Sequence, residues 1–156
     1  MRLRRIGMHL VIWIALAVVA VLLAARFGVF SGKPPANLGV RDGKLKPPAN
    51  TPNSVSSQAD LWPEAPLRDQ ARIAPLSLQG DGKATMAKIA EVIEDLPGSH
   101  IAERRDDYLY AQFTTPLMRF TDDVEFWFDP SAGAIQVRSA SRVGRKDFGV
   151  NRARVE

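Results

Sequence analysis

The chain has 156 residues, a length typical of one modest domain, with 21 lysines and arginines against 17 acidic residues. The first 30 residues carry four arginines and no acid, so residues 31–156 are neutral overall, with 17 residues of each sign. Because a nucleic-acid-binding protein carries its positive excess on the folded domain, we expect no nucleic-acid partner. The absence of cysteine excludes disulfides, thiolate metal sites, cysteine nucleophiles and lipidated cysteines.

Residues 6–25 form an apolar run of 20 residues without a formal charge. A helix of that length spans about 30 Å at about 1.5 Å per residue, which matches the hydrocarbon core of a bilayer. The run therefore predicts a transmembrane helix. A cleaved secretory signal is the alternative, because Ala24 and Ala25 resemble a cleavage site, although the apolar region of such signals is usually shorter.

Three arginines, Arg2, Arg4 and Arg5, precede this run. Cytoplasmic flanks of transmembrane helices are enriched in arginine and lysine, so these residues predict a cytoplasmic N-terminus. We therefore expect a single-pass protein of the inner, cytoplasmic membrane, in which residues 1–30 are a basic tip and an anchor in the lipid bilayer. The rest of the chain is expected on the periplasmic or another extracytoplasmic side, within the cell envelope.

Residues 31–75 hold eight of the 11 prolines. Proline fixes φ and lacks a backbone donor, so we expect neither a helix nor a central strand in this segment. A semi-rigid spacer is one interpretation of this composition. Isolated apolar residues recur along the segment, and they favour an ordered strap over residues 37–62, pinned against a folded core. These residues are Leu38, Val40, Leu45, Val55, Leu61 and Trp62.

One amphipathic helix is predicted over residues 82–96, with Asp81 as a suitable N-cap and Pro97 with Gly98 as a stop. Its apolar face consists of Met86, Ile89, Ala90, Ile93 and Leu96. Alternating apolar and polar residues after this helix predict strands, and a short apolar segment before it is a candidate for one more. The predicted strands cover residues 73–78, 100–104, 108–115, 123–129 and 134–140.

A turn-like segment, residues 129–133, joins the last two predicted strands into a hairpin. Its simplest register pairs Phe128 with Ile135, Phe126 with Val137, and Glu125 with Arg138. The fold class that follows is α+β: an antiparallel sheet of four or five strands with one packed helix, preceded by an N-terminal transmembrane helix and a Pro-rich strap. We divide the chain into residues 1–30 (tip and anchor), 31–75 (linker or strap) and 76–156 (α+β core).

His100 is the only histidine outside the apolar run, which excludes a metal site with two histidines from the folded part. The sequence also lacks glycine-rich phosphate-binding motifs, so we expect no metal, cofactor or nucleotide. A Ser-His-Asp triad would have to use His100 as its base, but no G-x-S-x-G motif accompanies it. We therefore expect no catalytic residue and favour a non-enzymatic protein. A hydrolase or transferase that uses His100 with a nearby serine or carboxylate is the alternative.

An acidic cluster surrounds one predicted strand and consists of Asp122, Asp123, Glu125 and Asp129. Two adjacent carboxylates can bind a hard cation or share a proton. Adjacent strand residues point to opposite faces, however, so we expect these carboxylates to pair with arginines. Arg138 and Arg142 are the nearest candidates.

The C-terminal segment, residues 137–156, is rich in arginine, with hydroxyl and amide side chains between the basic ones. Arginine forks beside such donors suit a carboxylate or phosphate group, so this segment is a candidate site for an anionic ligand. The alternative is that the arginines only neutralise the acidic strand. The candidate ligand-binding residues are Arg138, Ser139, Ser141, Arg142, Asp147, Asn151 and Arg152.

Four strings carry a family resemblance: NLGVRDGKL at 37–45, TPNSVSS at 51–57, FTDDVEFWFD at 120–129 and VRSASRVGRKDFGVNRARVE at 137–156. In this order they resemble the bacterial and plastid family called domain of unknown function fourteen-ninety-nine. The resemblance runs from residue 37 to residue 156 and implies an ordered strap but no activity. The two cysteines usual in the family correspond to Pro48 and Ser54, so the resemblance implies no redox or metal role for that pair. Family members commonly continue beyond the last string, where this sequence ends at Glu156.

Three functional hypotheses follow. The first is a non-enzymatic, membrane-anchored envelope domain that binds an anionic or lipid-like ligand or a membrane-protein partner. The second is the enzyme that uses His100. The third is an accessory subunit in which an exposed aromatic stripe, formed by Tyr108, Tyr110 and Trp127, docks onto another membrane protein.

Overall fold

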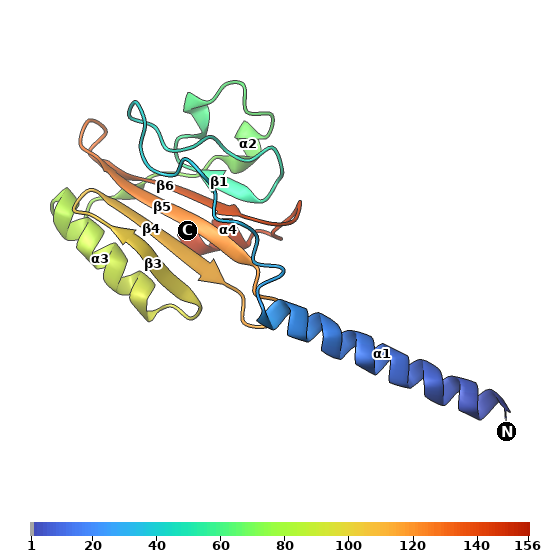
Figure 1. Cartoon of the computed structure of the whole chain (residues 1–156). Helices are drawn as coiled ribbons and strands as arrows, with labels where there is room; N and C mark the ends of the chain where they lie inside the picture. The colour runs from blue at the N-terminus through green and yellow to red at the C-terminus, as the bar shows by residue number, and fades with distance from the viewer. Residues whose placement is uncertain (1) are drawn as a thin grey trace.

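The computed structural model describes residues 2–156. A long helix, α1 (Arg2–Arg26), extends from one end of a folded core (Figure 1). Its stretch Gly7–Arg26 is long and apolar enough to cross a membrane, which agrees with the predicted span. The other elements are β1 (Ser54–Ser56), η1 (Ala59–Leu61), α2 (Arg68–Ala71), β2 (Leu76–Ser77), α3 (Gly82–Asp95), β3 (Ser99–Arg104), β4 (Tyr108–Thr114), β5 (Thr121–Asp129), β6 (Ala134–Ser141) and α4 (Val150–Val155).

Six strands form one antiparallel sheet in the order β1-β6-β5-β4-β3, and β2 pairs with another part of β6. The α+β prediction is therefore confirmed, and so is the hairpin register, in which Phe128 lies opposite Ile135 and Glu125 opposite Arg138. The strand that the sequence did not predict is β1, whose three residues are too few for a periodic pattern. Part of the expected linker thus belongs to the sheet, and the boundaries at residues 30 and 75 stay predictions.

The strand predicted over residues 73–78 is shorter in the structure, because β2 spans only Leu76–Ser77. Pro75 has no N–H to donate to a strand ladder, so the strand begins after it. Ile73, on the other side of the proline, is buried in the core but lies outside any strand.

The hydrophobic core lies between α3 and the inner face of the sheet. The side chain of Asp81 accepts a hydrogen bond from the backbone N–H of Ala84 (2.7 Å), which confirms Asp81 as the N-cap of α3. Met86 and Ile93 pack from this helix against alternate residues of β4, β5 and β6. The buried members of the core are Val55, Ile73, Met86, Ala90, Ile93, Leu109, Ala111, Phe113, Val124, Phe126, Ile135 and Val137.

The outer face of the sheet is covered by the first part of the strap, where Leu38, Val40 and Leu45 pack as predicted. Two of the other predicted anchors do not lie there, because Val55 belongs to the core on the inner face and Leu61 is 46% exposed. Leu45 is fully buried and packs against Tyr108 and Tyr110, with Trp127 at the edge of the same cluster. The backbone N–H of Leu45 donates a hydrogen bond to Oε1 of Gln58 (2.7 Å), so the two ends of the strap are joined to each other. Tyr108 is 1% exposed and Tyr110 9%, so the expectation of an exposed aromatic stripe is wrong. The strap itself occupies that surface.

We expect Gly98→Ala to destabilise the core more than Gly80→Ala. Both glycines have positive φ, but a methyl group at Gly98 would lie 2.4 Å from the carbonyl oxygen of Thr114, whereas one at Gly80 would meet nothing within 4 Å. The free energy of unfolding should fall by about 3 kcal/mol for Gly98→Ala and by about 1 kcal/mol for Gly80→Ala, because only the first adds a clash to the left-handed strain. Chemical unfolding of both variants measures the difference, and equal losses would contradict the clash.

Candidate functional site

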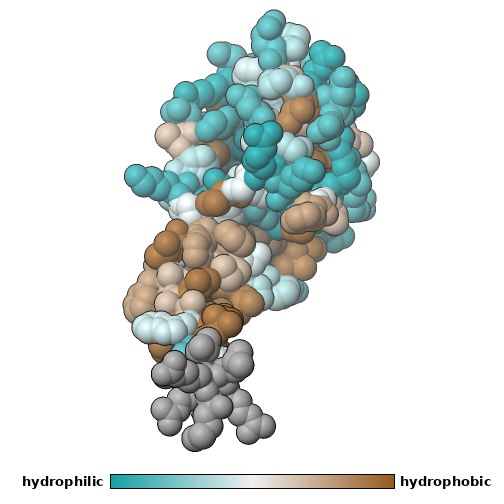
Figure 2. Space-filling view, turned by 90° about the vertical axis from the view of Figure 1, so that its right-hand side faces the viewer, coloured by the Kyte–Doolittle hydropathy of each residue, from teal (hydrophilic) through white to brown (hydrophobic). Residues whose placement is uncertain are grey.

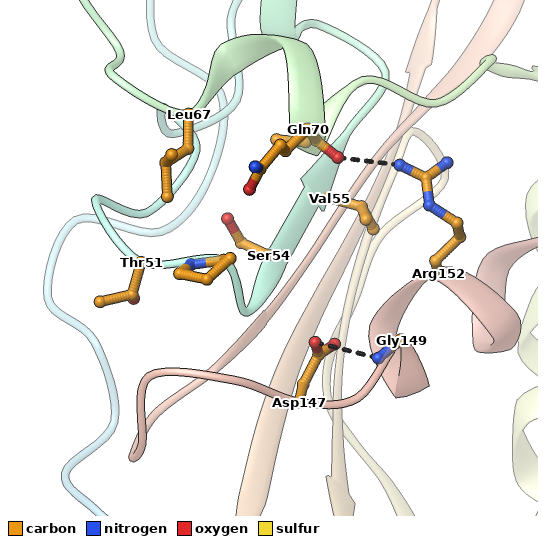
Figure 3. A pocket seen from close by; sticks show the side chains of 10 residues that line it. Thr51, Ser54, Val55, Leu67, Gln70, Asp147, Gly149 and Arg152 are labelled. Atoms are coloured by element: carbon orange, nitrogen blue, oxygen red, sulfur yellow. Dashed lines mark hydrogen bonds between the residues drawn. The ribbon is translucent and has the colours of Figure 1, made fainter.

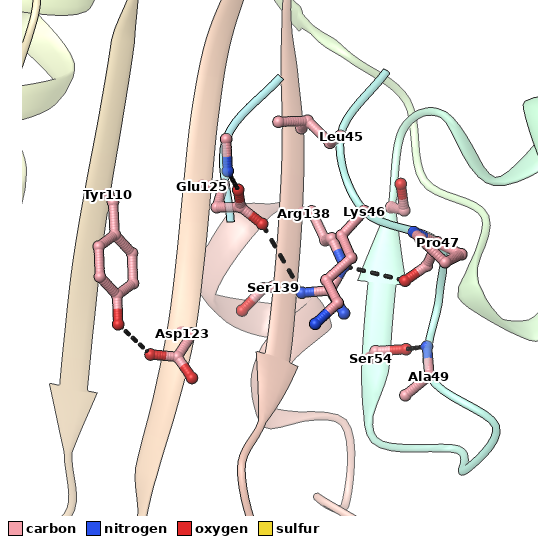
Figure 4. A network of polar contacts seen from close by, with 12 residues as sticks. Leu45, Lys46, Pro47, Ala49, Ser54, Tyr110, Asp123, Glu125, Arg138 and Ser139 are labelled. Atoms are coloured by element: carbon pink, nitrogen blue, oxygen red, sulfur yellow. Dashed lines mark hydrogen bonds and ion pairs between the residues drawn. The ribbon is translucent and has the colours of Figure 1, made fainter. Parts of the chain in front are cut away.

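Asp123 of β5 forms a buried ion pair with Arg142, which follows β6. Oδ1 of Asp123 lies 2.7 Å from Nη2 of Arg142, and the two side chains are 2% and 6% exposed. The hydroxyl of Tyr110 also donates to Oδ1 of Asp123 (Figure 4). The hydrogen-bonded carboxylate raises the pKa of Arg142, and burial raises the pKa of Tyr110. Asp123 and Arg142 therefore satisfy each other, as the sequence predicted for the acidic cluster.

Glu125 and Arg138 form a second buried pair, beneath the strap (Figure 4). Oε1 of Glu125 accepts hydrogen bonds from the backbone N–H of Gly39 (2.7 Å) and the hydroxyl of Tyr108 (2.9 Å). Among the described residues, Oε2 of Glu125 has no hydrogen-bond partner, and it lies 3.8 Å from Nη1 of Arg138. Nε of Arg138 donates to the carbonyl of Pro47 (3.1 Å), and burial lowers the pKa of this guanidinium. The pair therefore ties two backbone groups of the strap to the sheet.

A third polar cluster lies where α4 meets the inner face of β6. Asn151 is fully buried, accepts a hydrogen bond from the hydroxyl of Ser139 and donates one to the hydroxyl of Ser141 (2.9 Å). Oδ2 of Asp147 accepts a hydrogen bond from the backbone N–H of Asn151 (2.9 Å). Burial opposes the charge of Asp147, but the hydrogen bonds from Asn151 outweigh burial, so the pKa of Asp147 is lowered. This cluster fixes α4 on the sheet.

The partner of Asp122 is Arg154 of α4, with 2.7 Å between Oδ2 and Nη2. The sequence indicated Arg138 and Arg142 as partners of the acidic cluster, and both do pair with carboxylates of β5. Arg154 was missed because it lies on a helix of six residues that no periodic pattern revealed. The prediction that the acidic residues pair with arginines is thus confirmed for Asp122, Asp123 and Glu125, with one partner added. It is wrong for Asp129, whose carboxylate instead accepts hydrogen bonds from Ser131 and from the backbone N–H of Ala132 in the turn after β5.

The structure divides the seven candidate ligand-binding residues into two groups. Two of them, Asp147 and Arg152, border a cavity. The others do not line this cavity, and their partners lie inside the protein, so they hold the fold together whatever else they do. These internally paired residues are Arg138, Ser139, Ser141, Arg142 and Asn151. A ligand site made of all seven stays a prediction.

Asp147 and Arg152 face a polar cavity of about 180 Å³ between the strap, α2 and the start of α4 (Figure 3). Nη2 of Arg152 donates to the carbonyl of Gln70 (2.9 Å), and its Nη1 donates to Glu156 (2.7 Å). The volume is below the range of about 300–1,000 Å³ that is usual for small-molecule sites. An anionic ligand here would have to displace these contacts and approach the carboxylate of Asp147.

His100 lies on the edge strand β3, opposite Gln112 of β4, and its side chain is exposed. It lines neither the polar cavity beside Arg152 nor the two apolar hollows that border α3. The enzyme hypothesis therefore rests on this side chain alone.

An apolar groove of about 310 Å³ runs between α3 and α4 over the inner face of the sheet. Phe113 of β4 and Phe126 of β5 border it from the sheet. Ile89 and Val92 border it from α3, and Val155 borders it from α4. This volume lies at the lower end of the range for small-molecule sites, and the mostly apolar lining is typical of them.

Two cationic side chains border this groove. Lys88 is exposed on α3. The guanidinium of Arg154 lies 4.6 Å from the ring centroid of Phe113 while it pairs with Asp122, so its charge is already neutralised. Lys88 is thus the cation at the groove that is available to a ligand.

A second hollow, of about 420 Å³, continues the groove. It shares Leu96, Phe113 and Arg154 with the groove and extends to Pro97 and Pro116. Pro116 belongs to the loop between β4 and β5, which lies at the end of the sheet from which α1 leaves (Figure 1). The two hollows therefore adjoin, and the second extends their mostly apolar lining toward the base of α1.

Ile89 lies on the predicted apolar face of the helix, but the groove that it borders was not predicted from the sequence. One wall of the groove is α4, which is too short for a periodic pattern. A signal was present in Val92, which lies beside the predicted apolar face and broadens it beyond what the sheet covers. Because the apolar face of α3 is wider than the part of the sheet that covers it, some of its apolar side chains remain exposed.

A family model described as Protein of unknown function (DUF1499) matches residues 44–156. The match begins within the strap and includes every strand of the sheet as well as α3 and α4. No curated protein and no solved structure shows a significant match to the chain. The resemblance drawn from the four sequence strings is confirmed.

We expect Arg142→Met to lower the free energy of unfolding by about 3–5 kcal/mol, because it leaves the buried carboxylate of Asp123 without its cation. The matched control is Arg104→Met, which removes an exposed arginine whose contact with Glu94 (3.3 Å) is worth less than about 1 kcal/mol. Chemical unfolding measures both. The double variant Asp123→Asn/Arg142→Met should recover part of the loss, and a double variant no more stable than Arg142→Met would argue against an uncompensated charge.

Proposed function

Because the chain belongs to the family described as Protein of unknown function (DUF1499), whose description assigns no activity, we propose a function from the structure itself. We propose that the protein is a membrane-anchored, non-enzymatic domain that binds the acyl chain of an anionic, lipid-like ligand in the groove between α3 and α4. The observation that carries the proposal is the apolar path formed by the groove and the second hollow.

An acyl chain suits the path because its lining is apolar and extended. Burial of each CH2 group contributes about 0.8 kcal/mol, so a chain that follows the groove gains affinity with its length. Phe113 borders both hollows, and Val92 and Leu96 leave apolar surface exposed along the helix side. A chain in this position would remove that surface from water.

The direction of the path indicates where the ligand comes from. The second hollow ends at Pro97 and Pro116, near the base of α1, which is the proposed anchor. A lipid in the leaflet around α1 would therefore reach the groove through a mostly apolar hollow, whose polar lining residues are Thr114, Thr115 and Arg154. The membrane supplies the ligand at high local concentration.

Lys88 supplies the charge that would recognise the ligand's head. Its ammonium group can contact a carboxylate or a phosphate as a point charge, so both head groups are within the proposal. Arg154 remains with Asp122 and borders the groove as part of its wall. The proposed contact with the anionic group therefore lies on α3, and not at residues 137–156 as expected from the sequence.

The orientation of the anchor follows from the basic tip. Arg2, Arg4 and Arg5 precede the apolar helix, and such residues favour the cytoplasmic side. The core then lies on the extracytoplasmic side, which makes its ligand a lipid of the outer leaflet of the inner membrane.

Val92→Trp should block the groove, because the indole ring would fill the space of the chain. The full-length protein in lipid nanodiscs that contain a phosphatidylglycerol with a photoreactive acyl chain would be crosslinked and digested. We expect crosslinks on peptides of α3 and α4, reduced about tenfold in Val92→Trp, since displacing two CH2 groups costs about 1.6 kcal/mol. The matched control is Glu91→Trp, which places the same ring on the exposed neighbour outside the groove. Crosslinks confined to α1 would contradict the proposal.

Lys88→Gln should weaken binding by about twofold to fivefold, the size of one exposed ion pair. The measurement is competition of the same crosslinks by phosphatidylglycerol and by a long-chain fatty acid. Lys83→Gln is the control, because Lys83 lies on the same helix but pairs with Asp106 (2.8 Å) away from the groove. If the two lipids competed for the crosslinks as well in Lys88→Gln as in Lys83→Gln, the head group would not be recognised at Lys88.

A further inference from the structure

The end of the core beside α1 exposes apolar side chains on two loops. Leu117, 66% exposed, lies between β4 and β5, together with Phe120. Phe148, 95% exposed, lies between β6 and α4, together with Val143. Figure 2 looks at this end and shows brown patches on the core next to the apolar helix. We call Leu117, Phe120, Val143 and Phe148, with the cations of the same loops, the membrane-end surface.

Both loops are fixed relative to the end of α1. The ring centroids of Phe30, just after the helix, and Phe120 are 6.1 Å apart. A methyl group on Gly32 would lie 2.8 Å from side-chain atoms of Arg142 and Val143, so the chain passes close against the second loop. The exposed side chains therefore hold a set position with respect to the helix axis.

Exposed cations lie among these apolar residues. They are Arg119 on the first loop and Arg145 and Lys146 on the second. The acid that follows Lys146 is Asp147, and its carboxylate accepts a hydrogen bond from the backbone N–H of Asn151 (2.9 Å). The membrane-end surface is thus positive, and a leaflet rich in anionic lipids attracts such a surface.

Phe148 is the most exposed member, and its backbone is unusual. Its φ of +53° lies in the left-handed region, which costs a residue with a side chain about 1–2 kcal/mol. The result of this conformation is an aromatic ring held outside the core, in contact with solvent. Aromatic side chains with cations beside them are typical of protein segments at the membrane–water interface.

We propose that the membrane-end surface lies in the headgroup region of an anionic lipid leaflet, with Leu117 and Phe148 inserted among the lipids. The folded core then has its own contact with the bilayer, in addition to α1. This inference rests on the proposed anchoring by α1 but does not depend on a ligand in the groove. Continuity with the apolar helix and the positive charge of both loops select a lipid surface as the partner.

Because the chain has no cysteine, single cysteines report one position each. The full-length protein with Phe148→Cys, labelled with a fluorophore, would be reconstituted in vesicles of phosphatidylcholine and phosphatidylglycerol that carry nitroxide quenchers near the headgroups. We expect several-fold stronger quenching at Phe148→Cys and Leu117→Cys than at Ala132→Cys, an exposed position on the β5–β6 turn at the opposite end of the sheet. Equal quenching at the three positions would overturn the proposal.

Two further arms separate charge from anchoring. Removal of phosphatidylglycerol, or the change Arg145→Gln/Lys146→Gln, should lower the quenching at Phe148→Cys toward that at Ala132→Cys. Quenching that stays unchanged after both would overturn the anionic part of the proposal. Val18→Cys in α1, tested with a quencher deep in the bilayer, reports the anchor itself. Quenching at Val18→Cys without quenching at Phe148→Cys would refute the surface contact alone, and its absence at both would refute the anchor as well.

Discussion

The row of carboxylates on β5 is the constraint on which the rest of the structure depends. An ionised carboxylate removed from water costs several kcal/mol unless a cation or hydrogen bonds replace the lost hydration. Asp122, Asp123 and Glu125 are all buried, and each obtains its cation from a different segment: α4, the residue after β6, and β6 itself. The strap adds the backbone N–H of Gly39 to Glu125 and the carbonyl of Pro47 to Arg138, so the sheet is complete only when α4 and the strap are in place. The two segments that look least structured in the sequence are the ones that close the fold.

The regular elements could be predicted because apolar residues recur in the sequence with the period at which a helix or a strand turns side chains toward the core. The alternation in β5 and β6 fixes which side chains meet, and a slip of one residue would turn Phe126 and Val137 outward, so the register followed from the sequence. The strap could be inferred because Leu45 and other isolated apolar residues recur in a Pro-rich segment. A spacer exposed to water would not need such side chains, so they indicate contact with a folded core. By contrast, β1 and α4 are too short to carry a period, and tertiary contacts alone define them.

The candidate site was harder to predict than the fold. The sequence offered Arg138 and Arg142 both as partners of the acidic strand and as ligand-binding residues, because an arginine next to a serine has the same local sequence in either role. The apolar groove depends on the spacing between α3 and α4, which are far apart in the sequence. No local sequence pattern reports that spacing. Only the excess width of the apolar stripe at Val92 could have indicated it.

The junction between α1 and the core is short and ordered. The backbone N–H of Val29 donates to the carbonyl of Ala24 (3.1 Å), and that of Ser31 to Gly28 (3.0 Å), so turns continue directly from the helix into the core. A protein anchored through such a junction has almost no reach. Its encounters with other integral proteins would be collisions by lateral diffusion, in two dimensions and in one orientation, whereas a soluble molecule would meet only the faces that point away from the bilayer.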